Sequence, residues 1–128
     1  MRKYKNIIVD GEYLEKHPDH VFVFGDNCLR SGYGGGAKVR DYPNTYGFIT
    51  KKYPARNNEA YYIPEEYRPV FKMELEKLKA TIRENKDKTF LISQIGSGLA
   101  NKYKIWETII HLGLEALTEF DNVIFLYP

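Results

Sequence analysis

The sequence predicts one α/β domain spanning residues 1–128, with a mixed or parallel central sheet covered by helices on both faces. Two apolar segments, residues 21–24 and 90–92, are typical of strands buried on both sides. Two amphipathic segments alternate with the apolar ones, the first between them and the second near the end of the chain. This alternation indicates βαβ units, in which ligands bind beyond the carboxyl ends of the strands.

The first half of the chain contains short elements. Residues 7–9 are expected to form a short edge strand, and residues 21–24 the first buried strand. A helix is predicted to begin at Ala37 and to end or bend at Pro43, because proline lacks the N–H that helix hydrogen bonds need. Residues 47–49 and 61–63 are further strand predictions, separated by a polar loop.

The second half contains the strongest periodicity. Residues 64–85 are predicted to form a long helix, because apolar side chains recur at helical spacing at Phe71, Leu75, Leu78 and Ile82. Residues 90–92 follow as a buried strand, and residues 102–118 as a second amphipathic helix with Ile105, Ile109 and Leu112 on one stripe. Residues 123–126 close the chain as a strand.

Composition excludes several classes of function. The net charge of +2 is too small for general nucleic-acid binding, and the single cysteine excludes an internal disulfide or a multi-cysteine zinc site. The histidines lack ligand-like spacing, and no apolar run is long enough for a membrane span. We therefore expect a cytoplasmic protein with no metal, no cofactor and no membrane partner, and the oligomeric state stays open.

A glycine cluster follows the first buried strand. The strand ends in a polar tip, Asp26 and Asn27, and the cluster Gly34, Gly35 and Gly36 then precedes the predicted helix. Glycines let the backbone approach an anion closely, and the first N–H groups of a helix are free to bind it. The Asn27 amide can donate to and accept from ribose hydroxyls, and Asp26 can accept from hydroxyls or amines. A plain turn for the glycines and a turn or cap for the polar pair remain alternatives.

A second glycine corner, Gly96-Ser97-Gly98, follows the second buried strand. Backbone N–H groups in such a turn form an anion-binding concavity, although a simple strand-to-helix connection would have the same composition. Neither corner matches the P-loop pattern, because no Lys-Ser/Thr pair follows the glycines. Together the two corners predict a clamp for a diphosphate.

The order of these motifs resembles the macrodomain superfamily over residues 6–128. The likeness is greatest to the class of terminal ADP-ribose glycohydrolases and to small macro-like proteins of bacteriophages and bacteria. The motifs on which this resemblance rests are Asn27 with Gly34 and Gly36, the Tyr-Tyr-Ile sequence at residues 61–63, and the Ile-Gly-Ser-Gly-Leu corner at residues 95–99.

The resemblance implies a three-layer domain that binds ADP-ribose or a related nucleotide, and a module of this kind could sequester or sense a nucleotide signal. The two glycine corners would grip the diphosphate from opposite sides, with Asn27 near the distal ribose. An acidic residue near Asp10 or Glu12 would meet the adenine. The ligand-binding positions implied in this way are Asp26, Asn27, Gly34, Gly35, Gly36, Gly96, Ser97, Gly98, Leu99, Ala100 and Asn101.

The chain departs from the glycohydrolase class at its catalytic positions. That class has a lysine after the Tyr-Tyr strand and an aspartate after the second corner, where this chain has residues 64–66 (Pro-Glu-Glu) and Ala100-Asn101. Asp26 is then the only pocket carboxylate that could act as a general base. Lys51 and Lys52 would reach the pocket only if their loop folds back.

We therefore expect a binding protein rather than an enzyme. One alternative is an ADP-ribosyl hydrolase, acting on protein or nucleic acid, that uses Asp26 or a recruited lysine. The other is a structural or interaction protein whose cleft is filled by side chains such as Tyr33.

Overall fold

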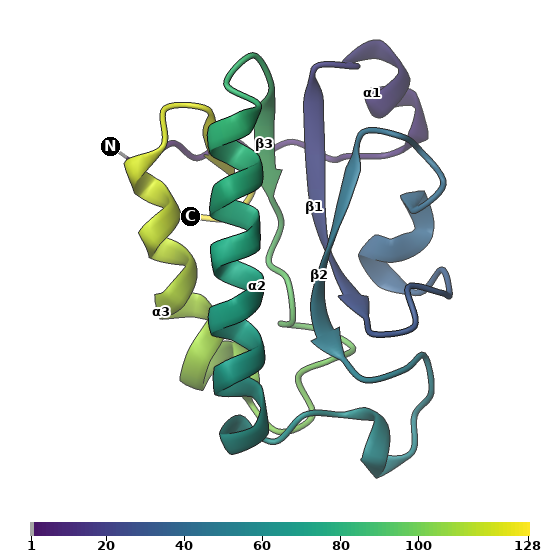
Figure 1. The fold of residues 1–128 in the computed structure, drawn as a ribbon. Coiled ribbons are helices and arrows are strands. Elements are labelled where there is room, and N and C mark those ends of the chain that lie inside the picture. Colours follow the sequence, from purple (N-terminus) through teal and green to yellow (C-terminus); the bar gives the residue numbers. More distant parts are fainter. Residues whose placement is uncertain (1) are drawn as a thin grey trace.

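The central sheet has four parallel strands in the order β2-β1-β3-β4, as Figure 1 shows for the computed structural model, which describes residues 2–128. The strands are β1 (His20–Asn27), β2 (Thr45–Lys51), β3 (Thr89–Ile92) and β4 (Val123–Phe125). The helical elements are α1 (Gly11–Lys16), the 3₁₀ turns η1 (Gly35–Val39) and η2 (Asn58–Ala60), the long α2 (Pro64–Glu84), and a C-terminal run of a π turn η3 (Trp106–Ile110), α3 (His111–Gly113) and a 3₁₀ turn η4 (Leu114–Glu119). The α/β class is confirmed.

The strand order creates a crevice beside β1. From β1 the chain proceeds to β2 on one side, and α2 then carries it back across the sheet to β3 on the other side (Figure 1). The connections that leave β1 and β3 at their carboxyl ends therefore diverge. In open parallel sheets, ligands bind where two neighbouring connections diverge in this way.

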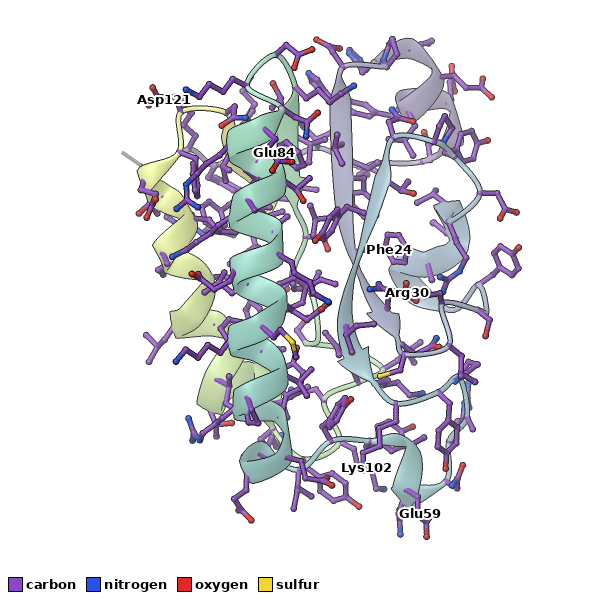
Figure 2. The ribbon with its side chains drawn as sticks, viewed as in Figure 1. Phe24, Arg30, Glu59, Glu84, Lys102 and Asp121 are labelled. Carbon is purple, nitrogen blue, oxygen red and sulfur yellow. The ribbon has the colours of Figure 1, made fainter. Side chains whose placement is uncertain are left out.

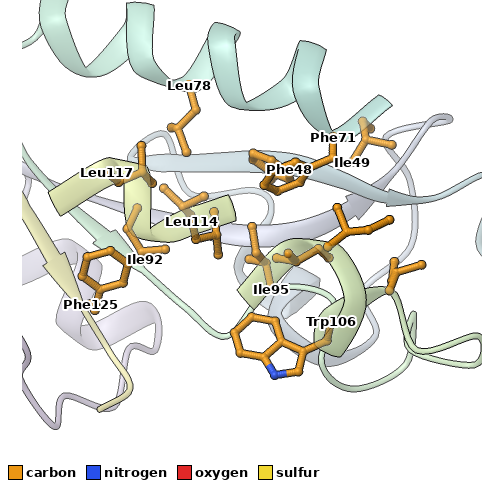
Figure 3. Close-up of a cluster of buried hydrophobic side chains, with 14 of the residues drawn as sticks. Phe48, Ile49, Phe71, Leu78, Ile92, Ile95, Trp106, Leu114, Leu117 and Phe125 are labelled. Atoms are coloured by element: carbon orange, nitrogen blue, oxygen red, sulfur yellow. The ribbon is translucent and has the colours of Figure 1, made fainter. Parts of the chain in front are cut away.

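Apolar side chains cover both faces of the sheet. On one face, α2 and the C-terminal helical run pack against β1, β2 and β3, and Figure 3 shows Phe71, Leu78 and Leu114 among the side chains of this cluster. On the other face, Val9 from the N-terminal segment and side chains from α1 and η1 pack against Phe22 and Phe24. Successive residues of β1 thus face opposite clusters, which explains why the segment is continuously apolar.

Helix α2 also protects the outer edge of β2. The Glu74 carboxylate accepts a hydrogen bond of 2.8 Å from the backbone N–H of Ile49, and the Tyr67 hydroxyl donates one of 2.6 Å to the carbonyl of the same residue. Both side chains are buried. They satisfy backbone groups that an edge strand would otherwise leave open to a further strand.

Replacing Glu74 with alanine is expected to lower the free energy of unfolding by about 1–3 kcal/mol, because the buried Ile49 N–H loses its acceptor. Chemical denaturation would measure the change. Glu76→Ala is the matched control, since that glutamate lies on the exposed side of the same helix and should change stability little. Equal effects of the two substitutions would contradict the role assigned to Glu74.

The structure of the N-terminal segment contradicts the strand predicted at residues 7–9. Residues 7–9 do not form a strand, because the sheet edge beside β4 is occupied by residues 3–5 instead. The Lys5 N–H donates to the Phe125 carbonyl at 3.0 Å, and the Phe125 N–H donates to the Lys3 carbonyl at 2.8 Å. Val9 contributes as a buried apolar side chain beneath the sheet and not as a strand residue.

The four strands are parallel, so of the two arrangements that the sequence allowed the parallel one forms and the mixed one does not. The segment at residues 61–63 contributes one antiparallel bridge, between Tyr61 and Lys51, and no strand. Pro64 begins α2 directly afterwards, which leaves this segment too short to extend the pairing.

The C-terminal helical run differs from the helix predicted over residues 102–118 in the residue at which it begins and in the face that it buries. Lys104 has a φ of +63°, a left-handed conformation that a helix does not continue through, so the run begins after it. The π turn η3 then rotates the buried face. As a result Ile110 and Leu114 are buried, whereas Leu112 is 75% exposed. Among residues 2–128, no helix combines the length and apolarity needed to span a membrane.

Candidate functional site

A cavity of about 540 Å³ lies at the carboxyl ends of β1, β2 and β3. Its lining comes from the tip of β1 with the loop up to Arg40, from the end of β2, and from residues 93–100. Figure 2 shows Lys102 toward this end of the molecule and Glu84 and Asp121 at the opposite end. The size is within the range of pockets that hold small ligands.

The first glycine corner forms one wall. Gly36 packs on the sheet so closely that an added methyl group would lie 3.3 Å from the Phe24 Cβ, and Gly35 has a φ of +57°. No hydrogen bond within residues 2–128 uses the backbone N–H of Gly34, Gly35 or Gly36. Three consecutive N–H groups of this corner thus have no partner in the described part of the chain, and all three glycines line the cavity.

The second glycine corner forms the opposite wall. Gly96 has a φ of +79°, in the left-handed region that favours glycine, and a methyl group there would clash with the Ile110 Cδ1. Gly98 has no atom within 4 Å of the position that a methyl group would take. The Leu99 side chain reaches across to the first corner, where a methyl group on Gly34 would lie 3.3 Å from its Cδ1. The two corners thus meet at the cavity.

The polar groups of the second corner serve the turn itself. The Ser97 hydroxyl donates to the Gln94 carbonyl at 2.7 Å. The Asn101 Oδ1 accepts from the Trp106 N–H at 2.9 Å, and its amide nitrogen donates to Glu107 at 2.6 Å. Asn101 therefore caps the C-terminal helical run and does not line the cavity, whereas Ala100 does.

Asp26 and Asn27 line the cavity, but their side chains are engaged within the protein. The Asp26 carboxylate is 2% exposed and forms ion pairs with Arg40 at 2.7 Å and Arg30 at 3.2 Å. The Asn27 amide donates to the Ser31 carbonyl at 2.7 Å and accepts from the Leu29 N–H at 3.0 Å. The turn that the sequence left open as an alternative is thus the geometry observed for Asn27.

Lys51 is a lining residue that sequence reasoning set aside. It ends β2, and its ammonium donates to the Ala55 carbonyl at 2.6 Å and lies 4.6 Å from the centroid of the Tyr61 ring. Burial, and then the nearby Arg56 guanidinium, lower the pKa of Lys51 below its ordinary value. The sequence predicted that Lys51 would reach the cavity only if its loop folds back, whereas in the structure it reaches the cavity as the last residue of β2, beside β1.

Three further residues are placed away from the cavity. Asp10 caps α1 by accepting from the Tyr13 N–H, and Glu12 pairs with Lys16 on the same helix, which precedes the amino end of β1. The structure therefore does not bring either acidic residue to the cavity. Tyr33 is 58% exposed and donates to the Asp41 carboxylate, so its ring does not fill the cleft.

Comparison with protein families matches residues 4–103 to one family, described as a family of unknown function, DUF7831. The matched region includes both glycine corners, Arg40 and Lys51. No curated protein and no solved structure matches the chain.

Proposed function

Because this chain belongs to DUF7831, a family of unknown function, we propose a function from the site itself: the protein binds ADP-ribose or a closely related nucleotide. The observation that carries the proposal is the meeting of two glycine corners across a cavity at the divergence of the β1 and β3 connections. We also propose that the sheet with its two covered faces represents a three-layer, macrodomain-like arrangement.

The diphosphate is the part of the ligand that this site fits best. Gly34, Gly35 and Gly36 offer backbone N–H groups without a partner in residues 2–128 on one wall, and on the opposite wall a methyl group added at Gly98 would meet no atom within 4 Å. Concavities formed by successive backbone N–H groups bind phosphate oxygens without needing a charged side chain.

Apolar groups at the cavity suit the rest of a nucleotide. Phe22, Pro54, Ile95 and Leu99 supply carbon surface, and the base can be covered by such side chains. The outward position of Tyr33 also favours a binding function over a vestigial pocket, because a vestigial pocket was expected to be filled by this side chain.

Isothermal titration calorimetry with ADP-ribose tests the proposal, and Gly98 gives a sharp variant. A Cβ added at Gly98 meets no protein atom within 4 Å, so we expect Gly98→Glu to fold while placing bulk and negative charge against the diphosphate. We expect wild-type protein to bind, Gly98→Ala to bind more weakly than wild type, and Gly98→Glu to lose binding by more than about tenfold. Absence of binding heat from wild-type protein at millimolar ADP-ribose would contradict the proposal.

A second candidate function is ADP-ribosyl hydrolysis, and the position of Lys51 favours it. A lysine whose pKa is lowered has a larger neutral, nucleophilic fraction, and this one lines the cavity. Asp26 is less suited to act as a base because two arginines hold its carboxylate.

Release of ADP-ribose from a modified protein or nucleic acid would be measured for wild type, Lys51→Met and Lys52→Met. If the protein is a hydrolase of this kind, Lys51→Met should lose at least about 100-fold in rate. Lys52, which pairs with Glu66 at 3.2 Å, is the matched control and should have little effect. Absence of turnover in the wild type leaves binding as the function.

A further inference from the structure

The loop that leads into the first glycine corner has an unusual backbone. Arg30 and Gly32 have φ values of +54° and +91°, and Gly35 follows with +57°. Residues other than glycine rarely adopt positive φ, and such a backbone persists only where surrounding contacts hold it. The Asn27 amide supplies one such contact by donating to the Ser31 carbonyl at 2.7 Å, and a group outside the loop supplies more.

The contacts of Arg40 identify that group. Its Nε donates to the Gly32 carbonyl at 2.8 Å, and its Nη2 donates to the Ser31 carbonyl at 3.0 Å. The same guanidinium donates to both carboxylate oxygens of Asp26, at 2.7 and 3.0 Å. Its central carbon lies 5.4 Å from the centroid of the Phe24 ring. One planar group thus ties two loop carbonyls to the tip of β1.

Asp26 is equally committed to this arrangement. Arg30 donates to the same carboxylate at 3.2 Å and to the Gly47 carbonyl of β2 at 2.6 Å. A methyl group on Gly47 would clash with the Asp26 carboxylate, so the absence of a side chain on β2 makes room for it. The carboxylate is therefore an internal anchor for two arginines.

We propose that Arg40, oriented by Asp26, is the positioning residue of this site: it sets the conformation of residues 31–36 and does not itself contact the ligand. A trans peptide carries its C=O and N–H on opposite sides. Holding the carbonyls of Ser31 and Gly32 therefore also fixes the directions of the N–H groups of Gly32 and Tyr33. The glycine corner then begins from a defined backbone, so that less conformational freedom is lost when an anion binds.

Lysine cannot replace arginine in this role. The planar guanidinium donates four hydrogen bonds and lies over the Phe24 ring. The ammonium group of a lysine cannot reproduce that geometry. The expected effect of Arg40 on affinity rests on the proposed nucleotide binding, whereas its effect on the conformation of residues 31–36 does not.

The test compares Arg40→Lys with Arg83→Lys. Arg83 is a matched control, because its guanidinium carbon also lies 5.4 Å from a phenylalanine ring, that of Phe120, and it pairs with Glu119 at 3.6 Å away from the cavity. Backbone ¹⁵N order parameters would be measured by NMR relaxation in residues 31–36 and in β1 and β3, and ADP-ribose affinity by calorimetry.

In Arg40→Lys we expect the order parameters of residues 31–36 to fall below about 0.6, while those of β1 and β3 stay near about 0.85. ADP-ribose should bind about tenfold more weakly or worse. Asp26→Asn should give the same pattern, and Arg83→Lys should change neither measurement. In Arg40→Ala, added methylguanidinium should restore part of both the order of residues 31–36 and the affinity, which general destabilisation would not allow.

Two results would overturn the inference. Weaker binding with unchanged order parameters in residues 31–36 would make Arg40 a direct ligand contact, and unchanged binding together with unchanged order parameters would remove its role. If wild-type protein does not bind ADP-ribose but Arg40→Lys still loosens residues 31–36, the proposed function fails while the positioning of the loop by Arg40 stands.

Discussion

Replacing Gly96 with alanine is expected to lower the free energy of unfolding by about 2–5 kcal/mol, which sums a left-handed backbone cost of about 1–2 kcal/mol and an overpacking cost of about 1–3 kcal/mol. The first cost arises because Gly96 has a φ of +79°, and the second because the new methyl group would clash with the Ile110 Cδ1. Ile110 is fully buried beneath the corner, so it has little room to move.

Gly98→Ala provides the control from the same corner. This glycine has no positive φ and no atom within 4 Å of an added methyl group, so its substitution should change stability by less than about 0.5 kcal/mol. Urea denaturation would measure both variants. Similar stability of the two would show that the corner tolerates a side chain at Gly96 and would contradict the packing described above.

Removing the Asp26 carboxylate is expected to be the second large effect. Asp26→Ala should lower the free energy of unfolding by about 3–5 kcal/mol, because Arg40, which is only 13% exposed, loses its ion-pair partner. Asp26→Asn keeps the shape and part of the hydrogen bonding, and should cost about 1–3 kcal/mol. Thermal and urea denaturation would both report the difference.

Asp41→Ala is the control for this experiment, because its carboxylate is exposed and bonded only to the Tyr33 hydroxyl. It should change stability by less than about 0.5 kcal/mol. A stable Asp26→Ala protein that had lost only a catalytic activity would indicate a general base at Asp26, and would contradict its assignment as an internal anchor.

Much of the fold could be predicted because local patterns decide it. Residues 21–24 and 90–92 are apolar on both faces and became β1 and β3, and the helical spacing of Phe71, Leu78 and Ile82 marked α2. The N-terminal strand was misplaced, since Ile8 is as apolar as a core residue yet exposed. Which segment occupies the edge beside β4 is decided by pairing with Phe125, a residue far along the chain.

The sequence shows which glycines shape the backbone of the candidate site, but it does not show which partners its side chains bind. Glycine positions are visible in the sequence, and both corners line the cavity as expected. The engagement of Asp26 was not foreseen, because its partner Arg40 lies fourteen residues away in sequence and nothing in the local pattern links the two. Lys51 was set aside for the same reason: its approach to the cavity depends on the place of β2 in the sheet.

The sequence by itself determined the alternation of strands and helices and the positions of the two glycine corners, because hydrophobic periodicity and glycine content act over a few residues. Only the tertiary structure decided that the sheet is parallel, that the corners meet at one cavity, and that Asp26 is bound to Arg40. These features depend on strand order and on close packing between distant segments. Such contacts form only after loop closure brings those segments together, so no local pattern records them.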